Sequence, residues 1–293
     1  MGIFSPPIDK DASYEYYRQG CEESNPKKKI RLFEKAIKAY PKNFSAWYQK
    51  GNVLIGLNKP EEALECFNTV LKIRPGFAYA WKGCGVALLK IGKPADTLRC
   101  CDKAIKIGGD NSTFWNMKGD ALRQLIQYER ALECYEKAIK INKGHAYPWN
   151  GKGWALFELK RYNDAFYCFS RANHLKPVFL WPLFGMAMCN YEIKKFDVAL
   201  SYFNKALAAN PDFIDAKQMR EETIREKIKL CMEPLIDKTM ESKQFVGFKD
   251  LKRSCFDNDL TQSALDVFHE IAEKKGYEII MVPDFGPTMR RNL

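Results

Sequence analysis

Residues 44–77 decide the fold, with the sequence FSAWYQKGNVLIGLNKPEEALECFNTVLKIRPGF, because their pattern recurs along the chain. A tryptophan returns at a constant interval, the distance from Trp47 to Trp81, which is the full length of residues 44–77. A glycine follows each tryptophan by four residues, as Gly51 follows Trp47. A spacing of four places both side chains on one face of a helix. Regular repetition with a period of this length indicates a repeat architecture. The tryptophans concerned are Trp47, Trp81, Trp115 and Trp149.

The second half of each period has the pattern of another helix. In residues 44–77 a small residue, Ala63, lies 16 positions after the tryptophan, and Phe67 and Val70 continue a buried stripe. Pro60 is a helix-starting signal, and Pro75 closes the period. Each period therefore predicts two antiparallel helices, a helical hairpin.

The pattern resembles the tetratricopeptide repeat, over about residues 44–211. That family's repeat has a tryptophan, a glycine four residues on, a small residue opening the second helix, an aromatic residue, an alanine and a closing proline. The resemblance implies an all-α fold, a right-handed superhelical solenoid of about six antiparallel helix pairs with capping helices. Small residues let the paired helices approach closely, and neighbouring hairpins bury one another's apolar faces.

Four segments are expected along the chain. Residues 1–43 form an atypical opening repeat with an N-terminal tail, and residues 44–213 hold five repeats of equal length. The fifth repeat is degenerate, with Leu183 in place of tryptophan. Residues 214–240 form a capping helix, since solenoids need one end covered. Residues 241–293 form a short helical region and tail outside the repeat.

Within that last segment, Phe248–Phe256 and Leu260–Lys275 are expected to be helices, and Tyr277–Val282 reads as a strand without an obvious partner. The tail from Met281 to Leu293 is expected to be disordered. The alternative is that it lies extended along the protein's own binding channel or that of a neighbouring molecule.

Charge and hydropathy bear on the cellular context. Residues 1–10 do not resemble a signal peptide and no long apolar run exists, so we expect a cytoplasmic protein without membrane insertion. The net charge of +11 divides into +13 on residues 1–211 and −2 on residues 212–293. A basic array is compatible with nucleic-acid binding, but the lysines lie near helix ends, where they complement the helix dipole. We therefore do not expect nucleic acid as a partner.

No motif for catalysis or for a cofactor is present. The three histidines lie far apart in the repeat, and HExxH, GxSxG and Walker-type sequences are missing, so we expect neither an enzyme nor a cofactor. A thiol recurs with the period of the tryptophans, as Cys66, Cys100, Cys134 and Cys168. Successive equivalent helices are too far apart for disulfides or a shared zinc ion, so these cysteines are predicted to be reduced, small packing residues without metal.

The resemblance also implies that the first helices line a concave channel. With residue 44 counted as position 1 of the first repeat, positions 2, 5, 6, 9, 12 and 13 of each repeat then face a bound peptide. The channel is polar in its first part and aromatic in its last, where large side chains offer contact area at little entropic cost. The predicted partner-binding residues are Tyr48, Asn52, Tyr79, Lys82, Asn116, Arg123, Tyr147, Asn150, Trp154, Phe157, Trp181, Phe184 and Tyr191.

Two readings of this channel stay open. Trp181 and Phe184 belong either to the docking surface or to a core under the C-terminal helices. Glycines at position 6, such as Gly83 and Gly151, either admit a ligand main chain or make room for a bulky neighbour such as Trp154.

The function expected is a non-enzymatic scaffold that binds a protein segment. The carboxylate clamp by which related domains hold chaperone tails is not matched, because Gly83 and Met117 stand at two of its positions. One alternative is a regulatory or specificity subunit of an enzyme supplied in trans. A weaker alternative is a nucleic-acid binder that uses the basic array.

Overall fold

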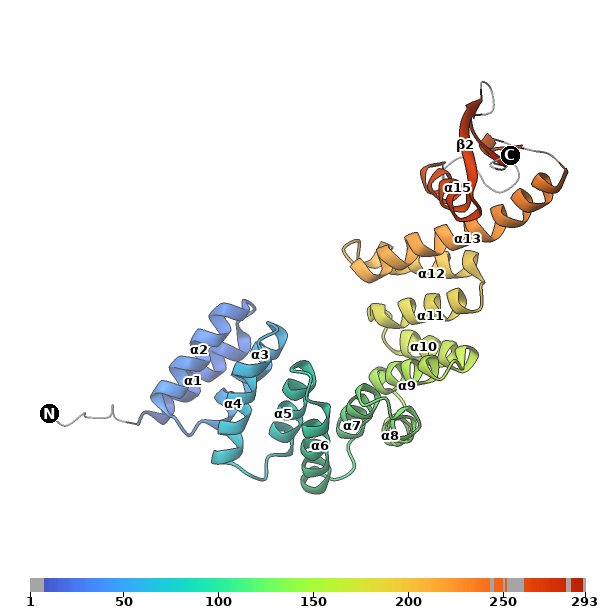
Figure 1. Cartoon of the computed structure of the whole chain (residues 1–293). Helices are drawn as coiled ribbons and strands as arrows, with labels where there is room; N and C mark the ends of the chain where they lie inside the picture. Colours follow the sequence, from blue (N-terminus) through green and yellow to red (C-terminus); the bar gives the residue numbers. More distant parts are fainter. Residues whose placement is uncertain (1–7, 243–244, 250, 252–260, 283–285, 292–293) are drawn as a thin grey trace. The chain divides into compact units, whose positions relative to one another are not determined.

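The structure is a computed structural model, and it describes residues 8–242, 245–249, 251, 261–282 and 286–291. The chain divides into two compact units, Met1–Lys176 and Pro177–Leu293. In the described part of the first unit all regular elements are helices (Figure 1). They are α1 (Lys10–Glu22), α2 (Pro26–Ala39), α3 (Phe44–Gly56), α4 (Pro60–Ile73), α5 (Ala78–Lys90), α6 (Pro94–Gly108), α7 (Ser112–Gln124), α8 (Tyr128–Ile141), α9 (Ala146–Glu158) and α10 (Tyr162–Leu175).

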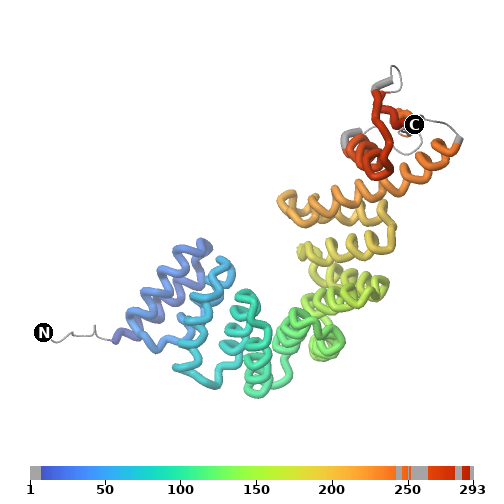
Figure 2. Tube along the Cα trace, viewed as in Figure 1, coloured from blue at the N-terminus to red at the C-terminus, as the bar shows by residue number. Residues whose placement is uncertain are grey.

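These helices pair in sequence order, and short loops join each to the next (Figure 2). The largest contacts join the two helices of one hairpin, such as α3 with α4 and α5 with α6. Neighbouring first helices also touch, α3 with α5, α5 with α7 and α7 with α9. The first helices therefore form a layer of their own, which confirms the repeat fold expected from the spacing of the tryptophans.

An aromatic ring lies between successive hairpins. Phe67 of α4 is fully buried, and its ring occupies the space where side chains at Gly51 and Gly83 would project. Tyr135 of α8 is held in the same way by Gly119 and Gly151. The glycines at position 6 therefore accommodate a bulky neighbour from the preceding repeat. The alternative in which these glycines admit a ligand main chain is wrong. The bulky neighbours are Phe67 and Tyr135, and not Trp154.

The repeat's tryptophans fix the loops between hairpins. The indole nitrogen of Trp47 donates to the carbonyl oxygen of Pro41 at 3.0 Å, and Trp81 donates to Pro75 at 3.3 Å. Trp115 departs from this pattern, since it donates to the carboxylate of Asp110 at 3.0 Å. A large half-buried side chain thus also satisfies its one polar group, as buried tryptophans generally do.

An ion pair between neighbouring hairpins recurs at one position of the repeat. Lys50 of α3 lies 2.8 Å from Glu34 of α2, and Lys118 of α7 lies 2.7 Å from Asp102 of α6. In both pairs the partners are 16 residues apart in sequence, which shows that α2 keeps the repeat register. Helix α1 differs, because Tyr17 stands where the repeat has a glycine. Gly20 lies against the Phe33 ring of α2 instead.

The second unit adds a different element to the repeat. The helices whose bounds are described are α11 (Leu180–Glu192), α12 (Phe196–Ala209), α13 (Ile214–Ser242) and α15 (Thr261–Lys275). The helix expected from residue 214 is present and continues to Ser242 as one helix. A sheet of three antiparallel strands follows, in the order β1 (Phe245–Gly247), β3 (Gly286–Arg291), β2 (Tyr277–Val282).

The sheet corrects the prediction for the tail. The strand expected at residues 277–282 is present, and its partner is β3, with Ile279 opposite Met289. Residues 286–291 are therefore ordered in the sheet and do not lie along a channel. Of the helix expected at Phe248–Phe256, residues 250 and 252–256 lie outside the described part of the chain. The four-segment division of the chain stays a proposal.

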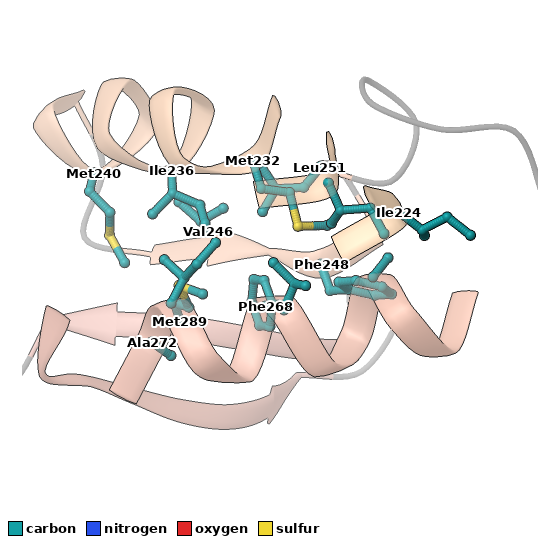
Figure 3. Packing of buried hydrophobic residues seen from close by; sticks show 14 residues of the cluster. Ile224, Met232, Ile236, Met240, Val246, Phe248, Leu251, Phe268, Ala272 and Met289 are labelled. Atoms are coloured by element: carbon teal, nitrogen blue, oxygen red, sulfur yellow. The ribbon is translucent and has the colours of Figure 1, made fainter. Parts of the chain in front are cut away.

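One hydrophobic core joins α13, α15 and the sheet. Met232, Ile236 and Met240 of α13 face Val246 of β1, and Phe268 of α15 packs below them (Figure 3). The Phe248 and Phe268 rings meet edge to face, with centroids 5.4 Å apart. Ion pairs such as Lys229 with Glu270, at 3.0 Å, also connect α13 with α15.

Candidate interaction surface on the first helices

The predicted residues of α3 lie at the start of the layer of first helices. Tyr48 is half-buried, and its ring packs against Phe67 and Phe77 with centroids 5.8 and 5.2 Å apart. Burial raises the pKa of the Tyr48 hydroxyl, and a hydrogen bond with Asn52 partly opposes the shift. Asn52 is exposed and donates to Gln49 at 3.2 Å. Both side chains therefore border solvent on the same face of the helix.

On α5 the two predicted residues differ in their surroundings. Tyr79 is half-exposed, and its ring meets Phe114 at 5.5 Å. Lys82 is half-buried and has neither an ion pair nor a hydrogen bond within the described ranges. Burial alone lowers the pKa of the Lys82 ammonium. An ammonium group without a carboxylate partner favours an anionic or strongly polar group beside it.

A polar network occupies the centre of α7. The hydroxyl of Tyr135 donates to Asp120 at 2.8 Å, and the amide of Asn116 donates to the same carboxylate at 3.0 Å. Burial raises the Asp120 pKa to about 6, while these hydrogen bonds and the charge of Arg123 act in the opposite direction. The sequence pattern indicated Asn116 and Arg123 but missed Tyr135. Its hydroxyl was the available signal, because the equivalent residues Phe67 and Phe169 lack one.

Three buried polar atoms near this network have no hydrogen-bond partner among the described residues. They are Oδ1 of Asn116, Nε of Arg123 and Oδ1 of Asn150. Helices α7 and α9, which carry them, touch each other. Unsatisfied buried groups cost free energy, on the order of 1–3 kcal/mol each, so they tend to mark places where water or a ligand completes the structure.

The aromatic part of the surface begins on α9. Trp154 meets Phe157 with centroids 5.6 Å apart and Phe169 with centroids 5.0 Å apart. Tyr147 is half-exposed, and its hydroxyl accepts a 2.7 Å hydrogen bond from Lys176. The structure thus brings the predicted residues of α9 together on one face of the layer.

In the second unit the predicted residues differ in their exposure to solvent. The side chain of Trp181 is 43% exposed, whereas Phe184 is only 8% exposed. Phe184 packs against Phe203 of α12 and Phe213, with ring centroids 5.8 and 5.5 Å apart. Its inclusion in a docking surface is corrected: Phe184 belongs to the core. Tyr48, at the same position of the first repeat, makes the equivalent contacts with Phe67 and Phe77.

Tyr191 lies at the end of α11, beside acidic residues of α13. Burial raises the pKa of its hydroxyl, and the negative charges of Glu222 and Glu226 add to the shift. Its ring contacts Phe196 at 5.8 Å. Tyr191 and Trp181 therefore keep surface that a partner can contact, on the first helix of the fifth repeat.

The cysteines are thiols in all nine positions that the structure describes. The four that recur with the repeat are buried, and burial raises the pKa of Cys66, Cys100 and Cys168 to about 11. Thiols held in the protonated form are poor nucleophiles and poor metal ligands. Within the described residues, no three His, Cys, Asp or Glu side chains are grouped as metal ligands would be.

Helices long and apolar enough to span a bilayer do not occur in the described part of the chain.

Comparison with known proteins agrees with this architecture. Family models for the tetratricopeptide repeat match residues 44–77, 112–145 and 183–212. A model for the protein prenyltransferase alpha subunit repeat matches residues 26–55, which overlap the opening repeat. No curated protein sequence matches the chain.

Several solved structures have a similar fold at low sequence identity. A chain of the APC/C hetero-tetramer Cut9-Hcn1 has a TM-score of 0.66 at 16% identity, over 72% of this chain and 42% of that one. The type IV pilus biogenesis factor PilW has a TM-score of 0.63 at 18% identity, over 72% of this chain and 99% of PilW. Yeast Tom70 has a TM-score of 0.59 at 16% identity, over 79% of this chain and 50% of that one. The chain thus spans less than half of the Cut9-Hcn1 chain.

Proposed function

Because the chain is a tetratricopeptide-repeat protein, we propose that it is a non-enzymatic scaffold that holds a segment of another protein against its first helices. One observation carries the proposal. Three large aromatic side chains, Tyr79, Tyr147 and Trp181, are all 43–44% exposed, and all three stand at position 2 of a repeat. Exposed aromatic residues at a repeated position favour docking, since they supply contact area at little entropic cost.

The polar residues on the same helices support the same function. Lys82 has no anionic partner among the described residues, and Asn116, Arg123 and Asn150 hold buried atoms without hydrogen bonds there. Carbonyl or carboxylate groups of a bound segment would accept hydrogen bonds from Lys82 and Arg123, and its N–H groups would donate to the amide oxygens of Asn116 and Asn150. In the first unit, Tyr48 and Asn52 extend the surface on α3, and Trp154 and Phe157 enlarge its apolar part on α9. In the second unit, Tyr191 lies on the same helix as Trp181. The Cut9-Hcn1 complex, one chain of which has a similar fold, is itself a hetero-tetramer.

A matched pair of variants tests the proposal. Tyr147 on first helix α9 and Tyr167 on second helix α10 are both exposed tyrosines. Tyr147→Ala should weaken capture of a protein partner about tenfold, as expected for an interface anchor, while Tyr167→Ala leaves capture unchanged. Equal losses in both variants, or none in Tyr147→Ala, would refute a docking surface on the first helices.

The alternatives predict other patterns. If the partner is an enzyme that the chain regulates, addition of the chain changes that enzyme's rate or substrate choice, and Tyr147→Ala abolishes the change. Nucleic-acid binding through the basic array would instead fall steeply with added salt and ignore Tyr147. Against this, Lys50, Lys118 and Lys152 of the array lie 2.7–2.8 Å from carboxylates of preceding second helices, so their charges are locally compensated.

A further inference from the structure

A pocket of about 320 Å³ opens beside Trp181 in the second unit. Its aromatic wall is built from Trp181 at the start of α11 and Phe213 before α13, whose ring centroids lie 5.2 Å apart in an edge-to-face arrangement. Phe184 packs against both rings, at 5.9 and 5.5 Å, and so holds the exposed indole in place. The wall is therefore fixed by the packing of the chain itself.

Two carboxylates border the same pocket. Asp212 and Asp215 both line it, and the Asp212 side chain is 97% exposed. Lys217 lies 4.0 Å from Asp212, which is the outer limit of an ion pair. Asp215 has no ion pair in the parts of the chain that the structure describes. Asn210 accepts a 3.0 Å hydrogen bond from the backbone nitrogen of Asp212 and so fixes this acidic loop.

At two corresponding aromatic residues of the first unit, a cation of the chain itself lies over the ring. Arg74 lies 5.8 Å from the centroid of the Phe77 ring, which is the equivalent of Phe213. Lys176 lies 4.7 Å from that of Tyr147, which is the equivalent of Trp181. Both cations occupy position 31 of their repeats.

The fifth repeat has no cation at this position. Asn210 occupies its position 31, where the first and fourth repeats have Arg74 and Lys176; the second and third repeats, with Gly108 and Asn142, also have no cation there. No lysine or arginine of the described residues lies over Trp181 or Phe213. The two rings are bordered by the carboxylates of Asp212 and Asp215 instead, which leaves an aromatic and acidic surface.

We propose that this pocket binds a cationic side chain of the partner segment, with arginine as the best fit. A guanidinium group stacks on an aromatic face and forms charge-assisted hydrogen bonds to carboxylates, and this pocket offers both kinds of surface. The inference rests on the proposed function, since Trp181 belongs to the surface that holds the segment. It adds a specificity: the part of the segment that reaches the fifth repeat carries a basic residue.

The test uses the full chain and N-acetyl-arginine amide, with N-acetyl-citrulline amide as the uncharged probe of nearly the same shape. The chain has six tryptophans, so six indole N–H signals are followed by ¹H–¹⁵N NMR. The signal that disappears in Trp181→Phe is assigned to Trp181. The arginine probe should shift the Trp181 signal in a saturable manner, and the citrulline probe should shift it at least fivefold less.

Asp212→Asn with Asp215→Asn should abolish the response to the arginine probe while the other indole signals stay in place. Glu129→Gln with Glu241→Gln removes two exposed carboxylates elsewhere, and it should leave the response intact. Equal shifts from both probes, no shift at Trp181, or a response that survives loss of both aspartates would overturn the proposal. Because Tyr147 lies outside this pocket, these outcomes are separate from failure of the proposed scaffold function.

Discussion

The ring of Phe67 lies against the bare backbone of Gly83, such that a methyl group at Gly83 would stand 2.7 Å from the ring. The same positions in the next repeat hold Cys101 and Met117, and there the Met117 side chain fills the space against Gly85. At these two interfaces a large residue in the second helix goes with a glycine in the following first helix, and a small residue goes with a methionine. The summed volume of the pair is thereby kept similar at both.

Gly83→Ala tests this packing. Overpacking a fully buried ring should lower the free energy of unfolding by about 1–3 kcal/mol, even though alanine favours helix formation. Gly56→Ala is the matched control, because Gly56 also lies in a first helix but has no atom within 4 Å of its added methyl group. In the control, the free energy of unfolding measured by urea titration should rise by up to about 1 kcal/mol. A stabilised Gly83→Ala variant would contradict the packing described.

Volume compensation gives a second prediction. Phe67→Cys alone leaves a cavity and should cost about 3 kcal/mol, and Gly83→Met alone overpacks the site. The double variant recreates the Cys101–Met117 arrangement and should recover at least half of the summed loss in a double-mutant cycle. Strictly additive losses would show that the two positions do not share one space.

Ile126 is strained in the turn between α7 and α8. Its φ angle is 61°, which β-branched residues rarely adopt, and its side chain is 71% exposed. Ile126→Asn should raise the free energy of unfolding by about 1 kcal/mol, because Asn58 has a similar angle at the equivalent position. Ile126→Val keeps the β-branch and should change the free energy of unfolding far less. A loss of stability in Ile126→Asn would assign the isoleucine a packing role.

The stability of the chain should depend on the ionisation of Asp120. Burial raises its pKa from 3.8 to about 6 on folding, so between these values the folded state holds a proton that the unfolded state releases. By linkage, this carboxyl makes the protein less stable as pH rises from about 4 to 6, by on the order of 3 kcal/mol, and has no further effect above that range.

Asp120→Asn should remove that dependence. The variant should match the wild type near pH 4 and exceed it in stability at pH 7, as measured by urea titrations across the range. Glu129→Gln, an exposed carboxylate of α8, serves as the control and should follow the wild type throughout. A difference between Asp120→Asn and wild type that does not vary with pH would refute the raised pKa.

The spacing of residues predicted the repeat fold because its determinants are local. Trp47, Gly51 and Phe67 act within one hairpin or on its neighbour, so the same residue types must return at each period. The first-helix positions followed from that register, in which Tyr79, Tyr147 and Trp181 share one position and stay exposed.

Other features depend on contacts that the period does not encode. β3 begins with Gly286 and Pro287 and buries Met289 among polar neighbours in sequence, so it lacked the pattern of a strand. Its pairing with β2 is tertiary. Phe184 was different: register alone placed it in the channel, whereas the rings that cover it, Phe203 and Phe213, stand at the repeat positions of Phe67 and Phe77 and so could have been recognised in the sequence. Tyr135 reaches α7 across the hairpin, a contact visible only once the two helices are in place.

The most direct test of the scaffold function is site-specific photo-crosslinking in the cell. Tyr147 on α9 is replaced by p-benzoylphenylalanine in one experiment, and Tyr167 on α10 in another; both sites are exposed. A protein segment held against the first helices predicts a discrete crosslinked partner from position 147 and none from position 167. Crosslinks of the same partner from both positions, or from position 167 alone, would contradict the account.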